Sequence, residues 1–195
     1  STDALPALLE RIDVLAVGAG LGQQAWGRAL WQQAMHSHLP MVLDADGLNL
    51  LAHDAHDFDT RPVVLTPHPG EAARLLSSHV AAVQADRFTA VRTLARRYRA
   101  VVVLKGAGSL IADVDGRVAL CPWGNPGMAS GGMGDVLGGV IAALMAQGQA
   151  AWQAACMGVG LHARAGALAS LGGQRGLLAS DLFEPLRKLV NTDGE

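Results

Sequence analysis

The sequence predicts an α/β domain built around a mostly parallel central sheet. Short apolar, β-branched runs alternate with helix-length stretches over most of the 195 residues, and this alternation is typical of βαβ units. Several of the runs are apolar almost without interruption, as in strands that helices cover on both faces. A chain of this length is expected to form one domain with a substantial core. We therefore treat residues 1–195 as a single domain.

Four strands are predicted from these runs, and helices occupy the intervals between them. A helix is expected over residues 23–36, directly after the glycines that follow the first strand. The predicted strands are residues 12–18 ("IDVLAVG"), 40–46 ("PMVLDAD"), 62–68 ("PVVLTPH") and 100–106 ("AVVVLKG").

An amphipathic helix is predicted over residues 85–99, because apolar residues recur there with helical spacing and arginines occupy the opposite face. We expect these arginines to form a solvated face rather than a binding patch. The apolar positions are Phe88, Val91, Leu94 and Ala95.

The second half of the chain begins with a predicted β-hairpin at residues 109–121, where an Asp-Gly turn separates two apolar runs. Residues 135–190 are predicted to be helical, with a break at residues 172–176 ("GGQRG"). Ser180 is expected to cap the final helix, since serine is a favoured residue at the start of helices.

The composition excludes several classes of partner. Charged residues make up 16% of the chain and the formal net charge is −2, so there is no basic field for nucleic acid or an acidic membrane surface. No apolar run is long enough to span a membrane. Cys121 and Cys156 form no CxxC pattern, which favours two core thiols in a reducing, cytoplasmic compartment.

Polar or glycine-rich motifs follow each of the four predicted strands. In open α/β sheets, ligands bind outside the carboxyl ends of the strands, so these motifs are expected to meet at one edge of the sheet. They are "GAGLG" (18–22), "DADGLN" (44–49), "TPHPGE" (66–71) and "KGAGS" (105–109).

A fifth motif, "GNPGMASGGMGDVLGG" (124–139), predicts an anion site. Gly131, Gly132 and Gly134 leave their backbone amides unobstructed, and a helix is expected to start near Asp135. Amides and the positive end of a helix dipole together suit a phosphate. Asp135 can then act as a general base for a hydroxyl that attacks a phosphoryl group. The structural alternative is an Asp N-cap beside glycines that allow close helix packing.

The motif "GAGLG" also invites comparison with the dinucleotide-binding fingerprint G-x-G-x-x-G. That fingerprint requires glycine where Gln23 stands, so the pattern is broken. Close approach of a ligand to this backbone is still expected.

The remaining strand-end residues have open alternatives. Asp44, Asp46 and Asn49 suit magnesium or a hydroxylated substrate, or else Asp46 caps a helix. His68 lies between two prolines and suits a substrate role, whereas Glu71 in a first helical turn is ordinary helix chemistry.

Lys105 suits a phosphate, or else it is a surface lysine beside a hairpin. The pairs His36/His38 and His53/His56 are expected to be exposed loop residues rather than metal ligands.

Four of these motifs, in this order, resemble those of the ADP-dependent NAD(P)H-hydrate dehydratases, a repair branch of the ribokinase-like superfamily. The resemblance runs over nearly the whole chain and implies a ribokinase-like three-layer α/β/α sandwich. Met133 stands where many relatives have Ser or Thr, and it keeps the backbone amide of the loop. The motifs are "VLDADGLNLL", "LTPHPGEAARLL", "VLKGAG" and "GNPGMASGGMGDVLGGVIAALMAQG".

The resemblance implies ADP-dependent dehydration of (6S)-NAD(P)H hydrate to NAD(P)H, with release of AMP and phosphate. It implies Mg²⁺ and ADP, or ATP, as phosphoryl donor, and a homo-oligomer, often a tetramer. It assigns Asp135 as the base, and Gly131, Gly132, Met133 and Gly134 as the phosphate loop.

Further site residues also follow from the resemblance. The hydrate site would contain Gly18, Gly20, Gly22, His68 and Asp135. The nucleotide site would contain Lys105, Gly106, Ala107, Gly108, Ser109 and Gly134. Supporting residues would be Asp44, Asp46, Asn49, Glu71 and Asn125.

The family's catalytic domain normally extends several dozen residues further at its N-terminus, and bifunctional members carry an epimerase domain. We therefore expect the chain to be N-terminally incomplete, with one sheet edge exposed or covered by another chain. Two other functions stay open: a small-molecule kinase of the same superfamily, acting on a vitamin precursor or sugar alcohol, and a non-catalytic nucleotide-binding fragment.

Overall fold

The computed structural model describes residues 5–54, 58 and 60–191. They form a six-stranded sheet in the spatial order β1-β2-β3-β4-β5-β6. The first four strands are parallel, and the last two add to the sheet as an antiparallel hairpin. The predicted α/β class is confirmed. The strands are β1 (Leu15–Val17), β2 (Met41–Leu43), β3 (Val63–Leu65), β4 (Val101–Leu104), β5 (Ser109–Ala112) and β6 (Val118–Cys121).

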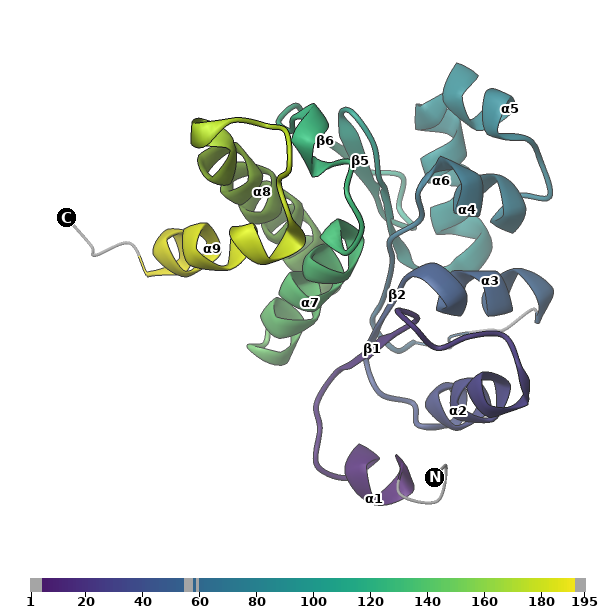
Figure 1. The fold of residues 1–195 in the computed structure, drawn as a ribbon. Helices are drawn as coiled ribbons and strands as arrows, with labels where there is room; N and C mark the ends of the chain where they lie inside the picture. Colours follow the sequence, from purple (N-terminus) through teal and green to yellow (C-terminus); the bar gives the residue numbers. More distant parts are fainter. Residues whose placement is uncertain (1–4, 55–57, 59, 192–195) are drawn as a thin grey trace.

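Helices lie on both faces of the sheet, which gives three layers (Figure 1). Each parallel strand pairs with the next strand in the chain, and right-handed crossovers then place the connecting helices on one face. These helices are α2 (Ala25–His36), α3 (Ala45–His53), α4 (Pro69–Leu75), α5 (Val80–Ala85) and α6 (Arg87–Tyr98). The other face carries α7 (Met133–Ala146) and α8 (Ala151–Ala169), with α9 (Phe183–Val190) beyond them and α1 (Leu5–Leu9) near the N-terminus.

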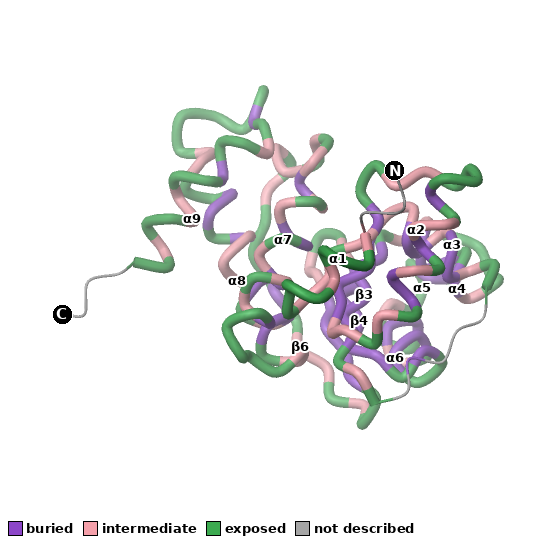
Figure 2. Tube along the Cα trace, turned by 90° about the horizontal axis from the view of Figure 1, so that it is seen from below, coloured by how far each residue is buried: buried purple, intermediate pink, exposed green. Residues whose placement is uncertain are grey.

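Each face of the sheet has its own core, and the central strands are buried from both sides (Figure 2). The crossover face packs large side chains, among them Trp31, Leu48 and Leu94. The α7 and α8 face relies more on small residues. The two helices approach closely at Gly158, where an added Cβ would lie 2.6 Å from Cγ1 of Ile141. The continuous apolar runs in the sequence are explained by this double coverage.

The amphipathic helix is confirmed as α6, with one correction. Val91, Leu94 and Ala95 are fully buried, but the Phe88 side chain is 46% exposed. Phe88 lies in the first turn of α6, where its ring contacts the guanidinium of Arg92 at 5.9 Å rather than the core.

The hairpin is confirmed by the antiparallel pairing of β5 with β6. The predicted Ser180 cap is wrong, because Ser180 lies inside a short 3₁₀ helix (Ala179–Leu182) that precedes α9. Asp181 closes that turn instead, since its Oδ2 accepts the Leu178 amide at 2.8 Å. Both cysteines are free, with Cys121 buried and Cys156 partly buried. Within the described residues no helix is long and apolar enough to cross a membrane.

Candidate functional site

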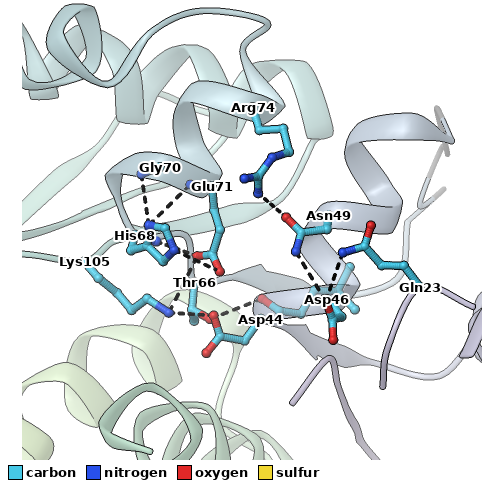
Figure 3. Close-up of polar contacts among 11 residues, drawn as sticks. Gln23, Asp44, Asp46, Asn49, Thr66, His68, Gly70, Glu71, Arg74 and Lys105 are labelled. Atoms are coloured by element: carbon cyan, nitrogen blue, oxygen red, sulfur yellow. Dashed lines mark hydrogen bonds and ion pairs between the residues drawn. The ribbon is translucent and has the colours of Figure 1, made fainter. Parts of the chain in front are cut away.

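Three strand-end loops meet at one ion-paired cluster (Figure 3). Lys105 follows β4, and its Nζ lies 2.6 Å from Oδ1 of Asp44, which follows β2. The same Nζ lies 3.9 Å from Oε2 of Glu71, in the first turn of α4. The two carboxylates are largely buried, with side chains 10% and 7% exposed. Lys105 is therefore not the free surface lysine of the alternative interpretation.

Asp46 organises the "GAGLG" loop after β1. Its Oδ2 accepts the Gly22 amide at 2.9 Å, and its Oδ1 accepts Nε2 of Gln23 at 3.2 Å. The hydrogen bond from the Gly22 amide is the main cause of a lowered Asp46 pKa; burial opposes it, and weaker hydrogen bonds from Gln23 and Asn49 add to the lowering. Asp46 does not cap α3, whose N-cap position belongs to Asp44.

Gly18 brings the first loop against the second. Its φ is +142°, and a Cβ at this position would lie 1.7 Å from the carbonyl oxygen of Asp44. The Asp44 amide donates in turn to the Val17 carbonyl at 3.1 Å. Only glycine fits here, because both the backbone conformation and the space exclude a side chain.

His68 caps α4 through a reciprocal pair of hydrogen bonds. Its Nδ1 accepts the amides of Gly70 and Glu71 at 2.9 and 3.4 Å, and Oε2 of Glu71 accepts the His68 amide at 2.8 Å. Because Nδ1 is an acceptor, we assign the ring proton to Nε2. The ring is 55% exposed, and its Nε2 lies 3.4 Å from Oε1 of Glu71, so His68 is joined to the Lys105 cluster through Glu71.

The loop 105–109 presents backbone amides. Lys105 anchors its start by donating its amide to the Pro67 carbonyl at 2.8 Å. Within the described part of the chain, the amides of Gly106, Ala107 and Gly108 have no hydrogen-bond partner. Gly106 and Gly108 have φ values of +145° and +70°, which explains why both are glycine.

The glycine-rich loop ends at Gly132, which has φ +84° and occupies the N-cap of α7. The helix begins at Met133, two residues before the predicted start, so Asp135 is its third residue and the N-cap alternative for Asp135 is wrong. The first amides of α7 have no intrahelical partner, and no side chain caps them. A Cβ on Gly134 would lie 3.0 Å from Oδ2 of Asp44 and 3.2 Å from Nζ of Lys105.

This contact joins the glycine-rich loop to the strand-end cluster. Asp135 itself is exposed, and no described residue forms a hydrogen bond or ion pair with it. Asn125 has a structural part: its Oδ1 accepts the Gly127 amide at 3.0 Å and its Nδ2 donates to the Gly166 carbonyl at 3.2 Å. It thereby ties the loop to α8.

The isolated histidines stay apart from this site. His36, His38 and His53 are exposed, as predicted, but His36 and His53 are the last residues of helices α2 and α3 rather than loop residues; His56 lies outside the described residues. Over residues 5–54, 58 and 60–191, no group of three or more His, Cys, Asp or Glu side chains is placed to hold a metal ion. A metal ion here would therefore need ligands from a bound molecule.

Two residues near the site were missed by sequence reasoning. Arg87, the first residue of α6, donates from Nη2 to the carbonyls of Leu104 and Gly108. His162, on α8, has a lowered pKa, chiefly because of burial; a backbone hydrogen bond to Met133 opposes this, and the charge of Lys105 adds to it. No sequence signal separated Arg87 from the other arginines of its helix, and His162 belongs to no motif.

Glycine turns at the carboxyl ends of parallel strands, facing an uncapped helix N-terminus, are typical of α/β proteins that bind phosphate groups. A family model described as NAD(P)H-hydrate dehydratase matches residues 1–188. The chain therefore belongs to the NAD(P)H-hydrate dehydratase family.

Curated relatives agree with this assignment. The chain is 48% identical, over 98% of its length, to a bifunctional NAD(P)H-hydrate repair enzyme of Coxiella burnetii, of which it covers 39%. It is 42% identical, over 97% of its length, to an ADP-dependent (S)-NAD(P)H-hydrate dehydratase of Neisseria meningitidis, of which it covers 67%. The chain thus spans about two-fifths of the bifunctional relative.

Solved structures share the fold. An ADP/ATP-dependent NAD(P)H-hydrate dehydratase from Bacillus subtilis, co-crystallised with ATP and Mg²⁺, matches with a TM-score of 0.81 and 31% identity, over 91% of this chain and 64% of that one. A ribokinase-like superfamily protein of Enterococcus faecalis matches with a TM-score of 0.83 and 26% identity, over 96% of this chain and 66% of that one. These matches confirm the expected ribokinase-like three-layer fold.

Proposed function

We propose that this chain catalyses the ADP-dependent dehydration of (6S)-NAD(P)H hydrate to NAD(P)H, with release of AMP and phosphate. The observation that carries the proposal is the contact of the α7 N-terminus with the ion-paired cluster, through Gly134. Gly134 belongs to the first turn of α7, whose start is uncapped and whose third residue is the exposed Asp135. The names of the Coxiella burnetii and Neisseria meningitidis relatives support the same reaction.

The proposed chemistry needs a base and an anion site. The hydrate carries a hydroxyl on its reduced nicotinamide ring, and hydroxide is a poor leaving group. Asp135 accepts the hydroxyl proton while that oxygen bonds to the terminal phosphorus of ADP and the bond to the bridging oxygen breaks, releasing AMP. The ring C–O bond then breaks, phosphate leaves with the electron pair, and a proton leaves the neighbouring carbon to restore NAD(P)H.

The two substrates are assigned to the two sides of Lys105. We place the adenine nucleotide on Lys105–Ser109 and Gly134, because the amides of residues 106–108 have no partner in the described part of the chain and Lys105 supplies a positive charge. We place the hydrate near Gly18, Gly20, Gly22 and His68, whose ring is 55% exposed. Positive charge and oriented amides would stabilise the phosphoryl group while it is transferred from ADP to the hydrate.

Magnesium fits this site only together with the nucleotide. Mg²⁺ in nucleotide sites is usually held by one or two carboxylates plus phosphate oxygens. Asp46 already accepts three hydrogen bonds, so Asp44 is the carboxylate that we expect to contribute. When bound, Mg²⁺ would neutralise charge on the transferred phosphoryl group.

The decisive experiment incubates the protein with ADP and hydrated NADH and records the absorbance of the reduced nicotinamide. We expect the absorbance to recover and AMP to appear in equal amount. No recovery, with phosphorylation of an alcohol instead, would support the small-molecule kinase. No recovery together with nucleotide binding alone would support the non-catalytic fragment.

The wider assembly belongs to the same proposal. We expect a single ribokinase-like domain acting in the cytoplasm, in keeping with two free cysteines. We expect a homo-oligomer, and we expect an epimerase domain on the same native chain, which is compatible with a relative named as bifunctional. Light scattering on the purified protein measures the oligomeric state. The intact mass of the native gene product shows whether a further domain is present.

A further inference from the structure

Arg87, the first residue of α6, forms hydrogen bonds at both ends of the loop 105–109. Its Nη2 donates to the Leu104 carbonyl at 3.2 Å, just before the loop, and to the Gly108 carbonyl at 3.1 Å, near its end. Its Nη1 donates to Oε1 of Gln84 at 3.0 Å, in the preceding helix α5. One planar guanidinium thus holds two carbonyls at fixed separation, which a lysine ammonium would do less well.

These bonds decide which way the loop faces. A third carbonyl, that of Gly106, accepts from Oγ of Ser109 at 3.2 Å. With these carbonyls held by the protein, the amides of the three central residues have no partner among the described residues. Gly106 packs directly against the guanidinium, because a Cβ there would lie 2.7 Å from Nη1 of Arg87. The loop is therefore shaped around the Arg87 side chain.

Arg87 also places an unbalanced charge behind the loop. Among the described residues no carboxylate forms an ion pair with it. Burial lowers the Arg87 pKa below its ordinary value, yet arginine stays protonated at neutral pH. A cation beneath a row of free amides favours an anion in front of them.

We propose that Arg87 is a positioning residue for the nucleotide: it orients the loop 105–109 so that its amides face the phosphates of an adenine nucleoside diphosphate or triphosphate. The inference rests on the proposed nucleotide site and extends it to a helix that no site motif included. Arg87 acts through the loop and does not contact the reacting atoms.

The test compares Arg87→Ala and Arg87→Lys with Arg92→Ala, a matched control on the same helix whose guanidinium contacts the exposed Phe88 ring and interacts electrostatically with Asp86, away from the loop. ADP binding is measured by calorimetry, and kcat and KM are measured for both substrates. We expect Arg87→Ala to raise the Kd and KM for ADP roughly 10- to 100-fold, as lost charge-assisted hydrogen bonds imply. The kcat and the KM for the hydrate should change little.

Guanidinium ion at millimolar concentration should partly restore ADP binding to Arg87→Ala and leave Arg92→Ala unchanged. Arg87→Lys keeps the charge and should be intermediate, and it serves as the test if the alanine variant does not fold. An equal loss of kcat whichever substrate is varied, together with a lower Tm, would overturn the inference. An ADP Kd for Arg87→Ala that matches that of the Arg92→Ala control would overturn it too. So would a wild-type protein that binds no adenine nucleotide. Wild-type ADP binding without recovery of NADH would refute the proposed function alone, and the Kd comparison would still decide the role of Arg87.

Discussion

The strand-end cluster and the glycine-rich loop meet at Gly134 but are built in opposite ways. In the cluster, side chains hold one another: Asp44 pairs with Lys105, and Glu71 completes a capping box with His68. In the loop, the groups offered to a ligand are backbone amides, and Asp135 has no described partner. One region is fixed before any ligand arrives, whereas the other keeps its hydrogen-bonding capacity free.

This difference separates carboxylates that position other groups from a carboxylate that is free to take part in chemistry. A carboxylate already engaged by two or three donors is a poor proton acceptor, because those donors stabilise its ionised form. Asp46 is such a group, with a lowered pKa set mainly by the Gly22 amide. Asp135 has no such donors among the described residues. The comparison therefore predicts that substitutions in the loop damage turnover, while substitutions in the cluster damage folding as well.

The largest effect is expected for Asp135→Asn. Removal of a general base typically costs 10²- to 10⁴-fold in rate, so kcat should fall by roughly that factor in the NADH recovery assay. ADP affinity and Tm should change little, because Asp135 is exposed and has no described partner. Asp115→Asn, at the exposed hairpin turn, is the control. Turnover retained by Asp135→Asn would remove it from the role of base.

The next effect is expected for Gly18→Ala. The new Cβ would meet the Asp44 carbonyl oxygen at 1.7 Å with φ at +142°, so the first and second loops must separate. We expect a loss of at least about 3 kcal/mol in the free energy of unfolding, measured with denaturant. Gly20→Ala is the matched control: its φ is +66° but no atom lies within 4 Å, and it should cost about 1 kcal/mol. Equal losses would show that the close contact is unimportant.

The sequence predicted the architecture well for a physical reason. The periodicity of apolar residues in strands and helices depends on burial. Because β2, β3 and β4 are covered on both faces, their sequences are continuous apolar runs that are easily recognised. Positions at helix starts were predicted less well. Ser180 and Phe88 were misplaced because Asp181 closes the turn before α9 and because the first turn of α6 faces solvent.

The candidate site was predicted as a set of loops but not as a set of contacts. The carboxyl ends of parallel strands must share an edge, so "GAGLG", "DADGLN" and "TPHPGE" were expected to meet. The pairing of Asp44 with Lys105, 61 positions apart, depends on side-chain reach that no local pattern encodes. Arg87 and His162 were missed for the same reason: each acts on a loop distant in sequence.

A smaller effect on stability is expected for Lys105→Met. The substitution keeps most of the side-chain volume but leaves Asp44, 10% exposed, without its cation. Breaking a buried pair costs several kcal/mol, and partial exposure here reduces this to about 2 kcal/mol. ADP binding should weaken as well. Lys188→Met is the control, because its pair with Glu184 is 71% and 77% exposed and solvent screens it, so its loss should change stability little. Similar losses for both variants would show that the Asp44 pair is no stronger than a surface one.

The smallest effect, and the one that links the two regions, is the pH dependence carried by His162. His162 lies on α8, where its ring forms a hydrogen bond with the backbone of Met133 and is affected by the charge of Lys105, and its Nε2 is buried without a described partner. Burial lowers its folded-state pKa below the ordinary 6.5, so between that value and the folded pKa the unfolded chain binds more protons than the folded one. The free energy of unfolding should then fall as pH drops below about 6.5, by at most about 1.4 kcal/mol per pH unit.

His162→Gln should remove this part of the slope while keeping a polar side chain beneath the loop. His38→Asn is the control, because His38 is exposed and its φ of +56° suits asparagine. Denaturant titrations at pH 7.5 and 5.5 measure the difference for all three proteins. If the slope persists in His162→Gln, the acid sensitivity originates elsewhere. If it disappears only there, the first turn of the phosphate loop is supported by a histidine that must stay neutral, and the two regions are coupled through α8 as well as through Gly134.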